Sequence, residues 1–369
     1  MKLKNNLFLL MPFLLVLVFL VSCSEEIELS SEPGETAVVY ALLDQEDSLH
    51  YIRINRAFYG TSNSLEAAKI PDSSYFKSVD AKIYEVRNQK DTLRIWTLKD
   101  TIVSNKDMNG IFYAPTQKLY YFETTSDKPL IAQKGYSYYL KARINKTHTI
   151  SSSTELIRDA SLASNLLSTY GFVATINTAD SKYASTNVSF KNGTSTTINT
   201  SLYLTVNEFK GSTMTAKRIE WNISDLEAST NKNNLAEAKG ELFFDVIKKN
   251  CALDKSITKR QLASIETVIT FGSEELRKYI LFTKPSSSIA QNKPVYTNIV
   301  SSNEMLRVRG LFSARTTKRF IKKSWEQVGS YYPRAIDQAT TRELCKGSTI
   351  DLLFCSDVPD DSKESFYCK

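Results

Sequence analysis

The feature that most constrains the fold is a two-residue alternation of apolar and polar side chains, repeated in many short segments. Residues 49–58 show it most clearly. One face of that segment carries His50, Ile52 and Ile54, and the opposite face carries Tyr51, Arg53 and Asn55. This period places alternate side chains on a core, which predicts a β-strand and argues against a helical bundle.

Segments of the same kind recur along the chain, separated by turn signals such as Asn109-Gly110, Lys134-Gly135 and Asn192-Gly193. They are residues 36–43, 79–86, 92–98, 118–123, 136–144, 172–176, 187–190, 202–209, 214–221, 261–271, 295–300 and 305–313. The 19 Tyr and 18 Phe favour strands. The pattern predicts a mainly β fold, beginning with a β-sandwich and containing a few short helices. Helices are expected within residues 63–69, 235–251 and 324–344, and after Gly272.

At 369 residues the chain is long for one core, so two folded domains are expected. A polar, Ser- and Thr-rich stretch at 147–154 and a change in the residue pattern near residue 159 suggest the boundary between the two domains. The predicted division is a signal peptide over 1–22, a tether over 23–35, a β-sandwich over 36–158, a second β-rich domain with helices over 159–320, and a cysteine-containing C-terminal segment over 321–369.

The N-terminus predicts a lipoprotein. Lys2 and Lys4 precede an apolar run that is short for a membrane span. Leu20-Val21-Ser22-Cys23 then has the form of a bacterial lipobox, in which the Cys23 thiol is diacylated, the signal is cleaved and the new amine is acylated. Acyl chains on Cys23 would hold the protein on a bilayer. Removing residues 1–22 leaves 45 basic against 40 acidic residues, a net charge of +5 without the focused basic stripe that nucleic-acid binding needs.

Short motifs add to this localisation. The acidic cluster Ser24-Glu25-Glu26 directly after Cys23 resembles the surface-export signal of Bacteroidota lipoproteins, although a solvated tether on the periplasmic face is the alternative. Three Asp-Ser/Thr-apolar triplets resemble the O-glycosylation sequon of exported Bacteroidota proteins; their hydroxyl residues are Ser48, Thr92 and Thr101. We expect an outer-membrane lipoprotein that faces the cell exterior.

Four cysteines remain after lipidation: Cys251, Cys345, Cys355 and Cys368. An even number in an exported protein predicts two disulfides, with three possible connectivities. Three of the four lie in the last 25 residues, so one bridge must lie within the C-terminal segment if all are paired. The other bridge would tie that segment back to Cys251. Zinc is disfavoured because no C-x-x-C pair is present.

The residues provide no recognisable catalytic constellation. The sequence has only two His, His50 and His148, both in strand-like segments, and no motif positions a Ser beside them. We therefore predict no catalytic residue, no cofactor and no resident metal. The acidic clusters at 44–47 and 357–361 fit solvated turns better than a loose Ca²⁺ site. Tyr120-Tyr121 and Tyr138-Tyr139 should each place one ring in the core and one outside, where it could contact a sugar or a protein.

Several motifs together resemble a functionally uncharacterised family of Bacteroidota outer-membrane lipoproteins. Besides the lipobox they are residues 37–43, 52–60, 67–73, 269–279, 294–299 and 310–315, and they span most of the mature chain. The resemblance implies an Ig-like β-sandwich followed by a second β-rich domain, and a place beside TonB-dependent transporters or other outer-membrane barrels. It implies no catalytic residue. The segment between Ile299 and Gly310 departs from the family's glycine-rich form, and the cysteine-bearing tail belongs to a subgroup at most.

Three functions follow as hypotheses. The first is a non-enzymatic surface lipoprotein that binds an outer-membrane β-barrel. The second is a nutrient-capture protein that binds a glycan or a peptide through exposed aromatic side chains. The third is a hydrolase of unrecognised type, which would need His50 or His148 in a cleft beside a Ser and a carboxylate.

Overall fold

The computed structural model describes residues 35–57, 69–106, 108–109, 113–163, 182–227, 233–283 and 296–369. Cys23, the predicted export signal, the strand predicted at 172–176 and nearly all of the helical turn predicted at 63–69 lie outside these ranges. Residues Glu35–Lys369 form one compact unit by their contacts. The fold is mainly β with few short helices, as the alternation predicts.

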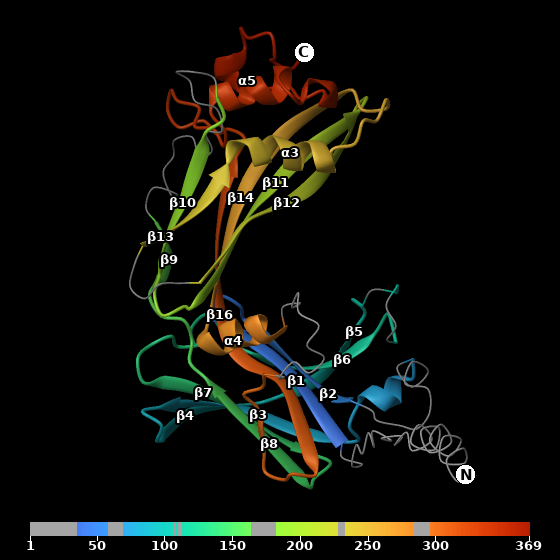
Figure 1. The fold of residues 1–369 in the computed structure, drawn as a ribbon, viewed down its shortest axis with the longest axis vertical. Helices are drawn as coiled ribbons and strands as arrows, with labels where there is room; N and C mark the ends of the chain where they lie inside the picture. The colour runs from blue at the N-terminus through green and yellow to red at the C-terminus, as the bar shows by residue number, and fades with distance from the viewer. Residues whose placement is uncertain are drawn as a thin grey trace, which may run out of the picture. The chain divides into compact units, whose positions relative to one another are not determined.

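The described residues form three sheets (Figure 1). An eight-stranded sheet has the order β12-β11-β14-β16-β1-β2-β6-β5, a five-stranded sheet β15-β8-β7-β3-β4, and a three-stranded sheet β13-β10-β9. The N-terminal strands are β1 (Glu35–Asp44), β2 (Leu49–Ala57), β3 (Val79–Arg87), β4 (Asp91–Thr97), β5 (Lys99–Val103), β6 (Gln117–Glu123), β7 (Tyr136–Ile144), β8 (His148–Thr154) and β9 (Ala160–Leu162). The later strands are β10 (Ser185–Asn192), β11 (Thr197–Lys210), β12 (Thr213–Glu227), β13 (Asn233–Lys239), β14 (Lys259–Gly272), β15 (Val300–Ser301) and β16 (Leu306–Lys323).

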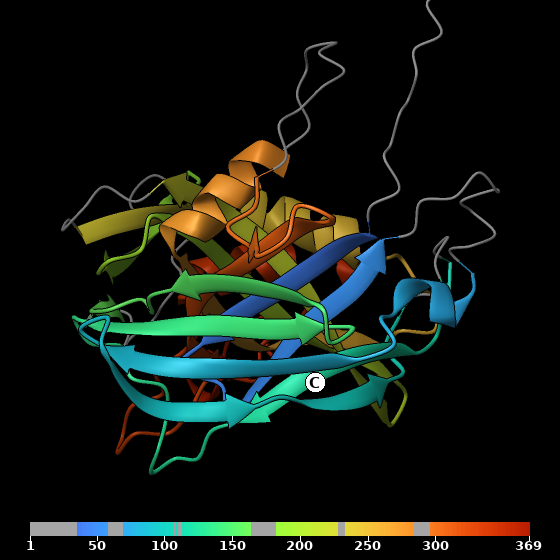
Figure 2. The same cartoon turned by 90° about the horizontal axis from the view of Figure 1, so that it is seen from below.

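The first module is a sandwich of β1, β2, β5, β6 and the start of β16 against the five-stranded sheet. Figure 2 shows β3, β4, β7 and β8 as one layer and β1 and β2 in the other. Buried side chains from both sheets form one hydrophobic cluster, which includes Val39, Ile52, Ile83, Leu140 and Phe312. Within it the buried carboxylate of Glu85 accepts bonds from Arg94 and from the Tyr138 hydroxyl at 2.7 Å, so this acid is paired rather than isolated.

One strand joins the two halves of the chain. β16 runs parallel to β1 along its first half, with Glu35 opposite Leu306 and Asp44 opposite Arg315. Its second half pairs antiparallel with β14, from Arg315 to Lys323. The sheet therefore continues through both modules. The eight-stranded sheet spans the division predicted after residue 158, and the buried side chains Leu306, Phe312 and Ala314 of β16 belong to the first cluster.

In the second module, one face of the long strands β11, β12 and β14 is covered by other elements. Helix α3 (Gly240–Asn250) and the C-terminal segment pack there in one cluster that contains Trp221, Phe243 and Ile265. The β9–β10–β13 sheet packs beside it around Phe190 and Phe271. The C-terminal segment contains α5 (Gln338–Lys346) and the short 3-10 helices η3 (Ile350–Leu352) and η4 (Pro359–Asp361).

Local differences from the sequence expectations have physical causes. Residues 235–239 form the end of β13, because they pair with β10. The helix therefore begins only at Gly240. Asn192-Gly193 does not close a hairpin, since β10 and β11 lie in different sheets. The helix expected within 324–344 is confined to α5, where Asp337 caps the N-terminus by accepting from Thr340 N at 2.8 Å. The helix expected after Gly272 is α4 (Glu274–Thr283).

Candidate functional site

The first candidate site is an aromatic surface on the outer face of β1 and β2. We call it the tyrosine face and define it by Tyr40, Leu49, Tyr51, Tyr121 and Tyr279. Strand alternation positions its members: the odd residues of β2 point outward while Ile52 and Ile54 are buried. Tyr279 comes from α4, a fully described helix with no buried residue that lies against β16.

The tyrosine face is held together by ring contacts. Tyr40 and Tyr279 meet edge to face with centroids 5.8 Å apart, and their hydroxyls are 3.0 Å apart. Burial of the Tyr279 hydroxyl, and its bond to Tyr40, raise the pKa of Tyr279 to about 12. Tyr51 and Tyr121 lie 6.3 Å apart. Tyr40, Leu49 and Tyr51 also line a hollow of about 340 Å³, yet they are 37%, 37% and 44% exposed. Clustered exposed aromatic side chains are typical of contact surfaces, so the tyrosine face is a candidate for one.

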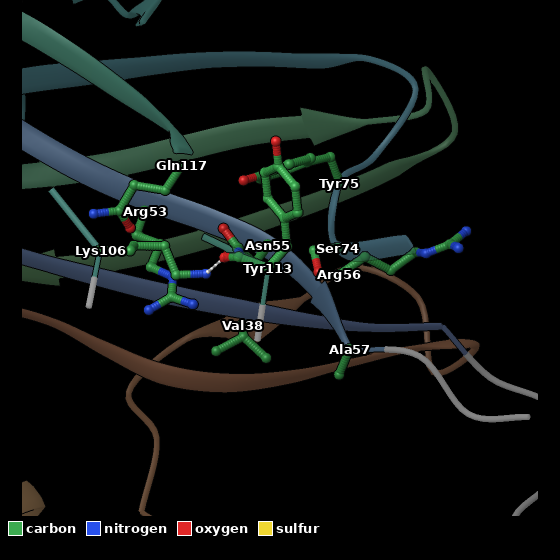
Figure 3. A pocket seen from close by; sticks show the side chains of 10 residues that line it. All are labelled: Val38, Arg53, Asn55, Arg56, Ala57, Ser74, Tyr75, Lys106, Tyr113 and Gln117. Carbon is green, nitrogen blue, oxygen red and sulfur yellow. Dashed lines mark hydrogen bonds between the residues drawn. The ribbon is translucent and has the colours of Figure 1, made fainter. Parts of the chain in front are cut away.

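The second candidate site is a basic pocket of about 260 Å³ beside the tyrosine face (Figure 3). It is lined by Val38, Arg53, Asn55, Arg56, Ala57, Ser74, Tyr75, Lys106, Tyr113 and Gln117. Val38 stands opposite Asn55, and Tyr40 opposite Arg53, in the β1–β2 pairing. The two sites therefore adjoin on one sheet face.

The cations of the basic pocket differ in their partners. The Lys106 ammonium donates to the Tyr113 carbonyl, and burial together with the nearby Arg53 charge lowers the pKa of Lys106. Arg56 points away from the other side chains in Figure 3 and donates to the Ser73 carbonyl at 3.3 Å. Among the described residues, none forms a hydrogen bond or ion pair with the Arg53 guanidinium. The Arg53 guanidinium therefore brings to the pocket a positive charge that no described residue pairs with.

The three predicted glycosylation residues lie on accessible parts of the first module. Ser48 is exposed in the turn before β2, Thr92 is exposed at the start of β4, and Thr101 is half-buried on β5. β4 and β5 are edge strands of their sheets. A modifying enzyme could reach these hydroxyls, and their modification remains a prediction.

The acidic side chains at 44–47 pair with basic side chains of β16, and the acidic tail has partners of its own. Buried Asp44 accepts from Thr317 at 2.9 Å and pairs with Arg315 at 3.5 Å, while Lys318 pairs with Glu46. In the tail, buried Asp361 accepts from Arg334, Gln338 and Ser356. These buried carboxylates therefore have structural partners. No group of three possible metal ligands occurs in the described ranges.

His50 is a core residue rather than an exposed base. It is 1% exposed, its ring stacks on Phe122 with centroids 4.6 Å apart, and its Nε2 lies 3.2 Å from Thr124 Oγ1. Burial lowers the pKa of His50 to about 4, although the Asp44 carboxylate acts in the opposite direction. His148 begins β8, in register with Ile144, and is half-buried. Neither imidazole is hydrogen-bonded to a carboxylate in the described part of the chain.

We predict that His50 makes the fold sensitive to acid. Its folded pKa of about 4 is below the ordinary 6.5, so the unfolded chain takes up the proton first and stability falls as pH drops from 6.5 towards 4. The loss should reach about 2 kcal/mol between pH 7.5 and pH 5. Urea unfolding of wild type and His50→Gln should show that difference in slope, with His148→Gln as the control for removing an imidazole. Parallel pH profiles for wild type and His50→Gln would contradict the prediction.

The cysteines are arranged differently from the expected two disulfides. Cys355 and Cys368 form one bridge within the C-terminal segment, with Cα atoms 5.0 Å apart. Cys251, after α3, and Cys345, on α5, are free, buried thiols in the cluster beneath the long strands. The expected bridge from the tail to Cys251 is absent, because both thiols pack as small apolar side chains. Burial raises the pKa of Cys345 to about 12 and also raises that of Cys251.

Thiol titration should reveal this arrangement. In the folded Cys23→Ala variant, which takes the N-terminal thiol out of the count, neither Cys251 nor Cys345 should react with an aromatic disulfide reagent, because both are buried and protonated. Unfolding without reductant should release two reactive thiols, and reduction should add the Cys355–Cys368 pair. Finding no thiol in the unfolded, unreduced protein would show that Cys251 and Cys345 are bridged after all.

No protein-family model matches this chain, and no curated protein matches it. In the described ranges no helix combines the length and the apolar character that crossing a membrane requires.

Sequence reasoning found part of these sites. Tyr120 and Tyr138 are buried while Tyr121 and Tyr139 are partly exposed, as the alternation predicts. The outward set of β2, which includes Arg53, was also visible in the alternation. Tyr40, Lys106 and Tyr279 were missed, because only the pairing of β1, β6 and β5 with their neighbours and the packing of α4 bring them to that face.

Proposed function

We propose that the protein is an outer-membrane lipoprotein, anchored through acyl chains on Cys23 and facing the cell exterior. It acts without catalysis as the binding partner of an outer-membrane β-barrel such as a TonB-dependent transporter. The observation that carries the proposal is the tyrosine face, an exposed aromatic surface built on the first two strands after the tether.

The composition of the tyrosine face suits a protein partner. Protein interfaces are enriched in Tyr and depleted of acidic side chains at their centres. Here the tyrosine rings and Leu49 supply apolar area, and their hydroxyls can bond to a partner's backbone. The helix α4 extends this surface with Leu281 and Phe282, each 43% exposed.

The length of the tether supports a partner at the membrane. Residues 24–34 separate Cys23 from the first residue of β1. Even fully extended, such a segment reaches about 40 Å. Because Tyr40 lies on β1 itself, a lipid on Cys23 would keep the tyrosine face near the membrane surface, where the rim of a barrel is available.

Copurification tests the partner. The protein, solubilised from membranes in mild detergent, should retain a barrel protein in stoichiometric amount. The double variant Tyr40→Ser/Tyr51→Ser should lose it, because it removes two exposed rings from the face. The control variant Leu93→Ser/Ile95→Ser removes exposed apolar side chains from β4 in the other sheet and should retain it. Absence of any stoichiometric barrel, or equal loss in both variants, would overturn the proposal.

The anchor has a separate test. Wild type should incorporate an alkyne-labelled fatty acid, and Cys23→Ala should not. Protease added to intact cells should digest the wild-type protein if it faces the exterior. Protection from protease in intact cells, with digestion only after lysis, would place the protein on the periplasmic side instead.

A second candidate function is the capture of a glycan or peptide ligand. The basic pocket favours it, because it is hollow and positively charged beside exposed tyrosines. Binding of a soluble ligand with no barrel in the detergent preparation would support this function over the first.

A further inference from the structure

We infer that the basic pocket is a binding site for a sugar acid, a small ligand that carries one carboxylate and several hydroxyls. The inference deepens the second candidate function. It is independent of barrel binding, because different side chains carry it and the two assays have separate readouts.

The charge of the pocket calls for an anion. Its lining residues include Arg53, Arg56 and Lys106 and no Asp or Glu. Arg56 is directed to Ser73 and Glu35, so Arg53 and Lys106 supply the charge inside. Their mutual repulsion contributes to the lowered pKa of Lys106. An anion placed between them would relieve this repulsion and regain energy lost on burial.

The geometry of the two cations suits a carboxylate. A guanidinium presents a planar fork that matches two carboxylate oxygens, and Arg53 has no bonded partner in the described chain that would compete. The Lys106 ammonium is positioned by its bond to the Tyr113 carbonyl and carries a second positive charge near Arg53. In Figure 3 the two side chains lie next to each other on the same side of the pocket.

A buried acceptor adds the requirement for a hydroxyl. The Oδ1 atom of Asn55 is buried and has no hydrogen-bond partner among the described residues. A buried acceptor without a donor costs free energy, which a ligand hydroxyl would recover. Unlike a fully ionised phosphate, a sugar acid offers both an anionic group for Arg53 and hydroxyl donors for Asn55. The volume of about 260 Å³ is below the range of drug-sized sites, which fits a single ring.

Isothermal titration of the full-length, detergent-solubilised protein tests the inference with galacturonate, galactose and inorganic phosphate. We expect galacturonate to bind with a dissociation constant of about 1 mM or tighter, and at least about tenfold more tightly than either of the other probes. Arg53→Met and Lys106→Met should each weaken galacturonate binding by about tenfold or more. Arg143→Met, which removes an exposed charge from β7, should leave it unchanged. Asn55→Leu should weaken binding of galacturonate, because it removes the buried acceptor.

Three results would overturn the inference. Galactose binding as tightly as galacturonate would remove the role of the carboxylate. Phosphate binding as tightly would indicate a general anion site. No binding of galacturonate by a wild-type protein with native near-ultraviolet circular dichroism would exclude a site for this sugar acid. Near-ultraviolet spectra of the variants separate loss of the site from loss of folding.

Discussion

Gly310→Ala should destabilise the protein by at least about 4 kcal/mol, the level at which single substitutions become exceptional. Gly310 lies in β16 opposite Val39, with a backbone φ of +108°. A Cβ at this position would lie 1.9 Å from the Val39 carbonyl oxygen, which cannot move without breaking the β1–β16 pairing. Because β16 belongs to both modules, the damage should spread to the β14 pairing.

Gly211→Ala is the matched control for Gly310→Ala. Gly211 also has a positive φ, +60°, but a Cβ there would meet nothing within 4 Å. It should cost only the backbone strain, about 1 kcal/mol. Chemical unfolding followed by circular dichroism measures both. Equal, small losses for the two variants would show that the β1–β16 approach is looser than described.

Arg260→Met should destabilise by about 3–5 kcal/mol, since it breaks a buried charge network. The Arg260 side chain is 2% exposed. Its guanidinium donates to Glu208 Oε1, the Leu352 carbonyl and the Ala252 carbonyl, each at 2.8 Å. It thereby fastens the C-terminal segment and the loop after α3 onto the sheet. Limited proteolysis of the variant should release a C-terminal fragment faster than in wild type.

Two further variants serve as controls for the loss of stability expected from Arg260→Met. Arg218→Met removes an ion pair to Glu266 in which the arginine is 52% exposed, and it should cost less than about 1 kcal/mol. Arg260→Met/Glu208→Gln should recover part of the loss, because the second change removes the carboxylate left without its partner. If Arg260→Met is as mild as Arg218→Met, the C-terminal segment is held by its apolar contacts alone.

The alternation in the sequence predicts the strand content well, because one buried face fixes every second side chain. It does not predict that β1 pairs in parallel with β16, since nothing local links Val39 to Gly310. The helix expected over 235–251 begins at Gly240 because residues 233–239 pair with β10, a long-range effect that overrides local periodicity. The number of cysteines can be read from the sequence, but the packing of Cys345 in an apolar cluster cannot.

The candidate sites, too, could be predicted from the sequence only in part. Arg53 and Asn55 share a face by strand period, and that much is readable from the chain. Lys106 follows β5 and Tyr279 belongs to α4, and only pairing and packing bring them to the β1–β2 face. Side chains that meet through tertiary contacts leave no spacing signal in one sequence.

Photo-crosslinking in living cells tests barrel binding most directly. Replacing Tyr51 by benzoylphenylalanine places a reactive ring at the most exposed aromatic position of the tyrosine face on β2. Irradiation should produce one major adduct, with an outer-membrane barrel protein identifiable by mass spectrometry. The same replacement at Ile95, which is 55% exposed on the other sheet, should produce no such adduct. An absent adduct at position 51, or the same adducts from both positions, would contradict the proposal that the tyrosine face binds a barrel.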